Sequence, residues 1–277
     1  MFIALLLLLE FGSPERVTIA GYSGDAMEPF LTRDGSILLF NNRNDPPSET
    51  DLHWAERIDD LTFAYRGKVQ GANSPALDAV PTVDVNGNIY FVTTRSYDQT
   101  LMTIYRGHFD RGLVTDVAPV TGISRLTPGQ VNFDVEVSAD GNTLYFTDGL
   151  FTGGSVPAAA DLAIATRGSD GQFHRVERLL NAVNTAALEY VACISADELE
   201  LFFTRIVDGT PAIFRSTRGD RQSAWGVPQR IAAITGFAEA PTIAPGGRAL
   251  YYHALRDGRF VIERVTRGAS RHRAVGH

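Results

Sequence analysis

A short unit of hydrophobic stretches around a polar turn occurs five times along the chain. In its first copy, residues 28–40, one apolar run precedes Asp34-Gly35 and a second, Ile37-Leu38-Leu39-Phe40, follows it. Val, Ile, Phe and Tyr suit the half-buried surface of a pleated sheet. Asp-Gly supplies the positive φ angles that a two-residue hairpin needs. The unit therefore predicts two antiparallel strands joined by a tight turn.

The spacing of the copies indicates the architecture. Their turn positions lie 49 to 57 residues apart and are Asp34, Asn86, Asp140, Asp197 and Gly246. A period near 50 with strand–turn–strand content is typical of a propeller blade rather than of a helical solenoid. A third strand ending on arginine follows each unit, and a fourth, less regular one follows the first four.

After Arg267 about ten residues remain, too few for a turn and a packed strand. We expect residues 16–20 to supply the missing strand of the last blade and close the ring, which removes exposed sheet edges. The sequence thus predicts an all-β fold, a five-bladed propeller of four-stranded antiparallel blades. Pro29, Pro81 and Pro241 share one register of the first strand. Because proline cannot donate to a ladder, the first strand of each blade is expected to line the central channel.

The repeat resembles TolB-type, WD-like propeller repeats, which read roughly P-x-x-S-x-D-G-x-x-ϕ-x-F-x-S-x-R. The first copy matches at Pro29, Asp34-Gly35, Phe40 and Arg43. The fourth copy lacks the glycine and the fifth lacks the aspartate. The resemblance covers nearly the whole chain, and it implies the fold without carrying over any catalytic residue.

We expect residues 1–277 to form a single domain, with an apolar extension over about 1–13 and a frayed tail over about 268–277. The apolar run 1–9 is too short to span a bilayer, which needs about 20 residues. It also lacks the basic start and small-residue cleavage site of an ordinary signal peptide. A strand, a misassigned start and an atypical signal all remain open for it. A soluble protein is predicted, with the cytoplasm slightly favoured over export.

The net charge of −7 and a pI near 5.4 disfavour nucleic-acid binding through phosphate contacts. Cys193 is alone, and the six histidines show no metal-ligand spacing. No metal site or cofactor is therefore predicted, although a cation such as calcium in the channel stays open. The sequence does not indicate an oligomeric state.

A carboxylate stands near the start of every first strand: Glu28, Asp78, Asp134, Glu189 and Glu239. They lie six to eight residues before the turn, so their registers are close but not equivalent. Fivefold geometry would bring them to one mouth of the channel, where like charges raise one another's pKa or recruit cations. The alternative is that each accepts hydrogen bonds from the backbone or from an arginine of a neighbouring blade.

The loops after the second strands surround that mouth. They carry polar candidates for ligand binding, together with Tyr190: Asn41, Asn42, Arg43, Asp45, Arg95, Asp148, Arg205 and His253. Asn132 and Asn184 also interrupt the repeat there. Amides, carboxylates and aromatic rings on a rigid scaffold suit a polyhydroxylated ligand such as a sugar. Because Arg43, Arg95 and Arg205 recur at one register, we interpret them as ties between blades that pair with the acids.

Three functions follow from these features. The first is a binding propeller that recognises a polar ligand, in particular a saccharide, at the acidic mouth. The second is a glycoside hydrolase, because five-bladed propellers with three channel carboxylates are similar in plan to arabinanase- and fructosidase-type glycosidases. That resemblance implies Glu28 as base or nucleophile, Asp78 as the residue that tunes pKa values, and Glu189 as acid. The third is a protein-docking scaffold without a small ligand.

Overall fold

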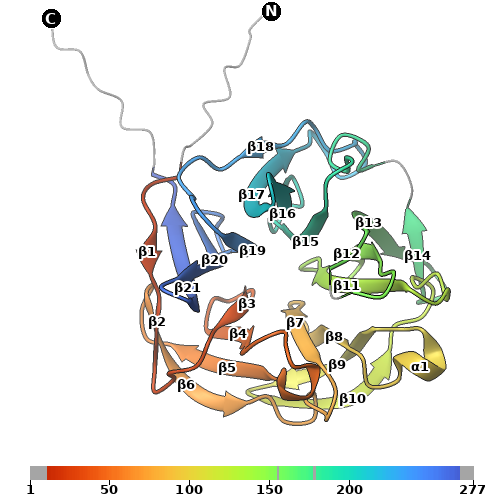
Figure 1. The fold of residues 1–277 in the computed structure, drawn as a ribbon, viewed down its shortest axis with the longest axis horizontal. Coiled ribbons are helices and arrows are strands. Elements are labelled where there is room, and N and C mark those ends of the chain that lie inside the picture. Colours follow the sequence, from red (N-terminus) through yellow and green to blue (C-terminus); the bar gives the residue numbers. More distant parts are fainter. Residues whose placement is uncertain (1–10, 155, 177–178, 269–277) are drawn as a thin grey trace, which may run out of the picture.

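The computed structural model describes residues 11–154, 156–176 and 179–268. It forms a five-bladed propeller whose sheets stand around a central axis (Figure 1). The predicted fold is confirmed. Most of the apolar extension and of the tail lies outside the described residues. Phe11 and Gly12 are described, and they already join the last blade through a bridge to Arg267 and a 2.8 Å bond from Gly12 N to Thr266 O.

Each blade has four antiparallel strands that run from the channel outward. Blade 1 contains β3 (Met27–Leu31), β4 (Ile37–Asn41), β5 (Leu52–Arg57) and β6 (Thr62–Lys68). Blade 2 contains β7 (Asp78–Val83), β8 (Asn88–Thr93), β9 (Ile104–Asp110) and β10 (Leu113–Pro119). Blade 3 contains β11 (Gln130–Val137), β12 (Thr143–Leu150), β13 (Ala159–Arg167) and β14 (Phe173–Val176). Blade 4 contains β15 (Glu189–Ile194), β16 (Glu200–Val207), β17 (Thr210–Thr217) and β18 (Gln229–Arg230).

Blade 5 contains β19 (Ala238–Ile243), β20 (Ala249–Arg256) and β21 (Arg259–Thr266), and the N-terminal strand β1 (Glu15–Arg16) completes it. The ring is therefore closed as predicted, but by a shorter and earlier segment. The expected strand 16–20 divides, because only Arg16 belongs to β1. Residues of β2 (Thr18–Ala20) instead run parallel to β6 and add a fifth strand to blade 1. The N-terminal segment thus spans the junction between the last and first blades.

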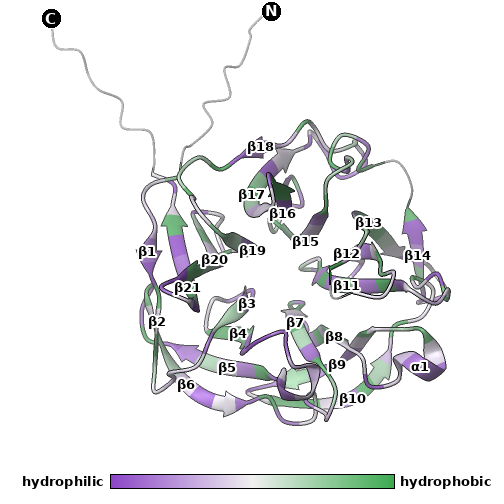
Figure 2. Cartoon of the chain, viewed as in Figure 1, coloured by the Kyte–Doolittle hydropathy of each residue, from purple (hydrophilic) through white to green (hydrophobic). Residues whose placement is uncertain are grey.

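Five apolar clusters, one at each junction between neighbouring blades, form the core of the described part of the chain. At the junction of blades 3 and 4, for example, Tyr145 and Ile164 pack against Leu201 and Phe203. Figure 2 shows hydrophobic residues along the strands of every blade and hydrophilic ones on the outermost strand β1. Burial on both sides of each sheet explains why the second strands are nearly continuous hydrophobic runs.

The innermost strands β3, β7, β11, β15 and β19 lie nearest the axis, as the three prolines predicted (Figure 1). We call the side of the ring on which these strands begin the mouth face. A short 3-10 helix (Pro47–Glu49) and α1 (Tyr97–Thr100) lie in loops of this face. Neither helix of the described residues is long or apolar enough to cross a membrane.

Candidate functional site

Every innermost strand carries a β-bulge at the same register, where one residue has a positive φ of 50 to 55°. The five residues are Glu28, Val80, Asp134, Val191 and Ala240. A positive φ is uncommon for a residue other than glycine and is strained for valine, and a bulge turns a side chain away from the regular alternation. The bulge therefore decides which side chains face the channel.

Polar side chains from the neighbouring blade hold these bulges. The N–H of Glu28 donates to His253 Nδ1 at 3.0 Å, and the N–H of Ala240 donates to Thr204 Oγ1 at 3.1 Å. The N–H of Val80 lies 3.4 Å from Asn41 Oδ1. In each pair the acceptor comes from the second strand of the preceding blade in the ring. Asn41 and His253, which the sequence suggested for ligand binding, thus link adjacent blades.

The five predicted carboxylates separate into two groups by register. Glu28 and Asp134 stand at the bulge, six residues before the turn, and Glu239 stands seven before it. Glu28, Asp134 and Glu239 come from blades 1, 3 and 5, yet their charges act on one another. They therefore converge inside the ring. Together with Tyr190 and His253 we call them the channel cluster.

Asp78 and Glu189 stand eight residues before the turn and do not join the cluster. Asp78 Oδ1 accepts a hydrogen bond from Arg95 Nη2 at 2.7 Å, and Glu189 Oε1 accepts one from Arg205 Nε at 2.6 Å. Both carboxylates are fully buried. These arginines were expected to tie different blades together, but each pairs within its own blade. The reason is that β7 pairs with β8 and β15 with β16, so that Arg205 lies directly opposite Glu189.

Burial dominates the electrostatics of the channel cluster. It raises the pKa of Glu28, and it raises the pKa of Asp134 well above the ordinary value, with Glu28 and Glu239 adding to the rise. Asn44 Nδ2 donates to Glu28 Oε1 at 3.0 Å. Glu28 Oε2 and Asp134 Oδ2 are buried without a hydrogen-bond partner. Asp134 therefore holds its proton more strongly than an exposed aspartate does.

Glu239 behaves in the opposite way. Burial raises its pKa, but hydrogen bonds from His253 and Tyr190 outweigh burial and hold the pKa below its usual range. His253 Nε2 lies 3.0 Å from Glu239 Oε2, and Tyr190 Oη donates to Oε1 at 2.5 Å. Because His253 Nδ1 accepts from the Glu28 N–H, Nε2 carries the hydrogen that it donates to Glu239.

Of the channel cluster, Glu28 lines a small cavity along the innermost strands. The cavity along the innermost strands measures about 20 Å³, which is close to the space of one water molecule. Small-molecule pockets usually measure about 300–1,000 Å³. No group of three or more His, Cys, Asp or Glu side chains among the described residues is arranged to hold a metal ion.

The remaining candidates of blade 1 lie in the loop after β4. Asn42 bonds to Glu49 O and to the N–H of Asp51, which braces the loop. Arg43 pairs with Glu49 at 2.6 Å on the surface. Asp45 is exposed in the same loop. The structure brings these residues together on the mouth face of blade 1.

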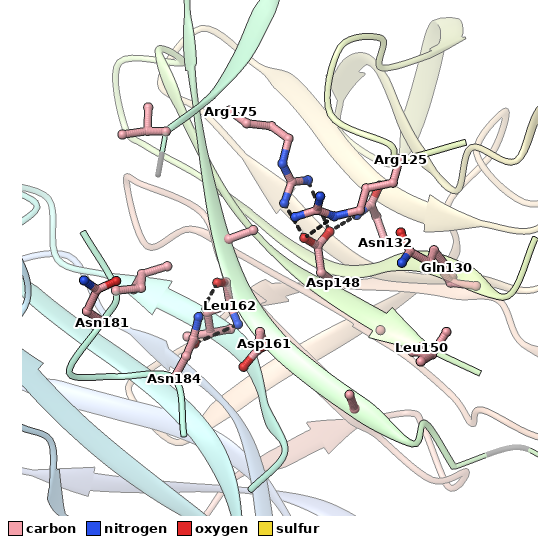
Figure 3. A pocket seen from close by; sticks show the side chains of 16 residues that line it. Arg125, Gln130, Asn132, Asp148, Leu150, Asp161, Leu162, Arg175, Asn181 and Asn184 are labelled. Carbon is pink, nitrogen blue, oxygen red and sulfur yellow. Dashed lines mark hydrogen bonds and ion pairs between the residues drawn. The ribbon is translucent and has the colours of Figure 1, made fainter. Parts of the chain in front are cut away.

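A pocket of about 590 Å³ lies on the mouth face of blade 3, at its side toward blade 4. We call it the blade-3 pocket (Figure 3). Its wall consists of the start of β11, the end of β12, the start of β13, the end of β14 and the connection to blade 4. The polar side chains that line it are Arg125, Gln130, Asn132, Asp148, Asp161, Arg175, Asn181 and Asn184.

Asp148 organises one side of the pocket. Its carboxylate accepts hydrogen bonds from Asn132 Nδ2 at 2.7 Å, from Arg125 Nε at 3.3 Å and from Arg175 Nη1 at 3.2 Å, and it also pairs with Arg175 Nη2. All its acceptor positions are occupied. Asn184 is likewise engaged, because it exchanges two hydrogen bonds with the backbone of Leu162. Within the described part of the chain, the groups with spare capacity are Gln130, Asp161, Asn181 and the outer nitrogens of Arg125.

The sequence indicated part of this pocket. Asn132 and Asn184 were assigned to the mouth face because they interrupt the repeat, and Asp148 because it follows a second strand. Arg125, Gln130, Asp161, Arg175 and Asn181 were missed as site residues. Asp161 lay inside a predicted third strand, and its position directly opposite Asp148 could have been inferred only from the register of that strand pair.

The sequence matches no protein-family model and no curated protein. Solved structures share its fold. A glycoside hydrolase is 11% identical with a TM-score of 0.63, covering 97% of this chain and 95% of that one. Zg3597, a family 117 glycoside hydrolase from Zobellia galactanivorans, is 12% identical with a TM-score of 0.60, covering 93% and 90%.

TolB from Acinetobacter baumannii is 14% identical with a TM-score of 0.49, and 88% of this chain is covered. The match spans 55% of the TolB chain, about half of its length. Putative TolB from Agrobacterium tumefaciens is 14% identical with a TM-score of 0.50, covering 84% of this chain and 70% of that one. TolB and glycoside hydrolase propellers are thus among the structures that this chain resembles, as its repeat and its five blades suggested. At these identities the likeness is one of fold.

Proposed function

We propose that this propeller binds a saccharide on its mouth face and that the blade-3 pocket is the binding site. The observation that carries the proposal is a pocket of about 590 Å³ whose wall combines amide, carboxylate and guanidinium groups. Its size falls within the usual range for small ligands. Gln130, Asn181 and Asp161 offer donors and acceptors that the fold does not use. Sugar hydroxyls need such groups on several sides.

Binding is favoured over hydrolysis by the placement of the carboxylates. Asp78 and Glu189 are fully buried against arginines, so neither can approach a glycosidic oxygen. Glu28 lies beside a cavity of about 20 Å³, which excludes a sugar ring. Two structures that share the fold are described as glycoside hydrolases. Their descriptions agree with a saccharide as the class of ligand, but they do not identify which residues of this chain would bind it.

The test is titration calorimetry of the full chain against a panel of oligosaccharides, alongside a panel of aryl glycosides as hydrolysis substrates. We expect binding to at least one oligosaccharide and no turnover. Gln130→Ala and Asn181→Ala should each weaken binding by about 2- to 10-fold, the contribution of one hydrogen bond.

Gln99→Ala serves as the matched control. Gln99 is an exposed amide on α1, on the same face but outside the pocket, and its loss should leave the affinity unchanged. Hydrolysis of an aryl glycoside, or binding that is insensitive to both pocket variants, would overturn the proposal.

A further inference from the structure

Two carboxylates of the blade-3 pocket lie directly opposite each other. Asp161 on β13 is the cross-strand partner of Asp148 on β12, so both residues belong to the same face of the sheet. In Figure 3 the Asp148 carboxylate lies against Arg125 and Arg175. Like charges in this arrangement destabilise a sheet. Positive charge from another side chain or from a ligand would stabilise such a pair.

The chain supplies that charge to only one of the two. Arg125 and Arg175 both bind Asp148, together with the amide of Asn132. Asp161 has no hydrogen-bond or ion-pair partner among the described residues. Burial, the charge of Glu189 and the charge of Asp148 raise its pKa, in that order. Glu189 itself is already engaged by Arg205. The Asp161 end of the pocket is therefore negative, whereas at the Arg125 end two guanidinium groups face one carboxylate.

We propose that Asp161 binds a protonated amino group of the ligand and that the pocket accordingly takes an amino sugar. This inference rests on the proposed saccharide function. Asp161 is exposed at the pocket wall, so an ammonium group can reach its carboxylate, and that group would offset the repulsion from Asp148. The amides of Gln130 and Asn181 are left for the hydroxyls.

The experiment compares three ligands of equal length: an oligomer of glucosamine, its N-acetylated counterpart and a neutral glucose oligomer. Affinities for the full chain are measured by calorimetry at pH 6. We expect the glucosamine oligomer to bind about tenfold more tightly than the other two, as for one charge-assisted hydrogen bond. The preference should decrease as the salt concentration rises.

The variant is Asp161→Asn, with Asp98→Asn as the matched control. Asp98 is an exposed carboxylate on α1, on the mouth face but outside the pocket, and its substitution changes the net charge equally. Asp161→Asn should abolish the preference for the glucosamine oligomer and keep binding to the neutral one, whereas Asp98→Asn should keep both. The thermal midpoint of Asp161→Asn should not fall, because the substitution removes a repulsion.

Equal binding of all three ligands to the wild type would overturn the assignment of an amino sugar and leave saccharide binding intact. The same loss of preference in both variants would attribute it to overall charge and overturn the role of Asp161. Failure of all three ligands to bind, together with a negative oligosaccharide panel, would overturn the proposed function as well.

Discussion

Arg33 of blade 1 reaches across the inside of the ring to Glu136 of blade 3, with 2.9 Å between Nη2 and Oε1. On the way its Nε donates to the Val83 carbonyl of blade 2 at 3.2 Å. The opposite oxygen of Glu136 accepts from Thr82 Oγ1 at 2.8 Å. Both charged side chains are largely buried. One side chain thus connects three blades at the end of the channel opposite to the mouth face.

Arg33→Met should therefore destabilise the ring strongly. Removing one partner of a buried ion pair leaves the other charge uncompensated and costs about 3–5 kcal/mol. Burial already raises the pKa of Glu136 despite Arg33, so the variant can take up a proton on Glu136. Its loss of stability should be smaller at pH 5 than at pH 8. Urea denaturation at both pH values measures the effect.

Arg43→Met is the control for this prediction. Arg43 pairs with Glu49 at 2.6 Å, but both side chains are exposed. Exposed pairs contribute at most about 1 kcal/mol. Equal losses in the two variants would show that the connection through Arg33 adds nothing to the ring.

The fold was predictable because its signals are local. Asp-Gly and Asn-Gly turns, hydrophobic strands and prolines at one register act within a few residues of each other. The fourth turn illustrates how far this extends. It lacks the glycine, and Glu198 takes the positive φ of 60° in its place, so the repeat persists even where its best marker is missing.

The site was predictable only in part, because side-chain direction depends on shifts of one or two residues. Glu28 stands at the bulge of its strand and faces the channel. Glu189 stands two register positions before the bulge of its own strand and pairs with Arg205. Pro29, Pro81 and Pro241 directly follow three of the five bulge residues, but proline is equally typical of a strand start or an edge strand, so it does not by itself mark the bulge. The reach of Arg33 and the placement of Asn181 depend on how blades pack, which no local pattern encodes.

Replacing Asp134 by asparagine should change how stability depends on pH. The pKa of Asp134 is raised well above its ordinary value by burial, so the folded state keeps a proton that the unfolded chain releases above about pH 4. The contribution of Asp134 to the free energy of unfolding is complete below that pH. It is lost as the pH rises toward the pKa that Asp134 has in the folded state. The loss approaches about 1.4 kcal/mol per pH unit.

Asp134→Asn should remove this slope and raise the thermal midpoint at pH 7 to 8. Thermal unfolding of wild type and variant between pH 4 and 8 gives the comparison. Parallel curves would indicate that Asp134 is ionised in the folded protein and that the channel cluster does not hold a proton.

His53 should produce a decline in stability on the acid side. Its ring is buried against Phe40 and bonds through Nδ1 to Tyr65 Oη at 2.9 Å. Burial lowers the pKa of His53 to about 4. Because the folded state resists protonation, stability is complete above the unfolded pKa of about 6.5 and falls as pH decreases toward 4. The decline amounts to at most about 3 kcal/mol.

His53→Phe should flatten that decline, since phenylalanine can keep the stacking on Phe40 but takes up no proton. The variant loses the bond to Tyr65, so a modest decrease at pH 7 is expected. Thermal midpoints at half-unit steps from pH 7 to 4 test the difference in slope. An unchanged slope would assign the acid sensitivity to other groups.

Glu189→Gln distinguishes a structural carboxylate from a catalytic one. Glu189 is fully buried, and it accepts hydrogen bonds from Arg205 at 2.6 Å and from Thr185 Oγ1 at 2.6 Å. The substitution leaves the Arg205 guanidinium without its charge partner, so we expect the free energy of unfolding to fall by roughly 3 kcal/mol. Asp78→Asn should behave alike, because Arg95 loses its partner in the same way.

Catalytic groups show the reverse pattern, since replacing them commonly leaves stability unchanged or improves it. Urea denaturation of both variants beside Asp98→Asn, whose exposed carboxylate should matter little, measures the difference. A Glu189→Gln protein as stable as the Asp98→Asn control would contradict the structural assignment and return Glu189 to the candidates for acid catalysis.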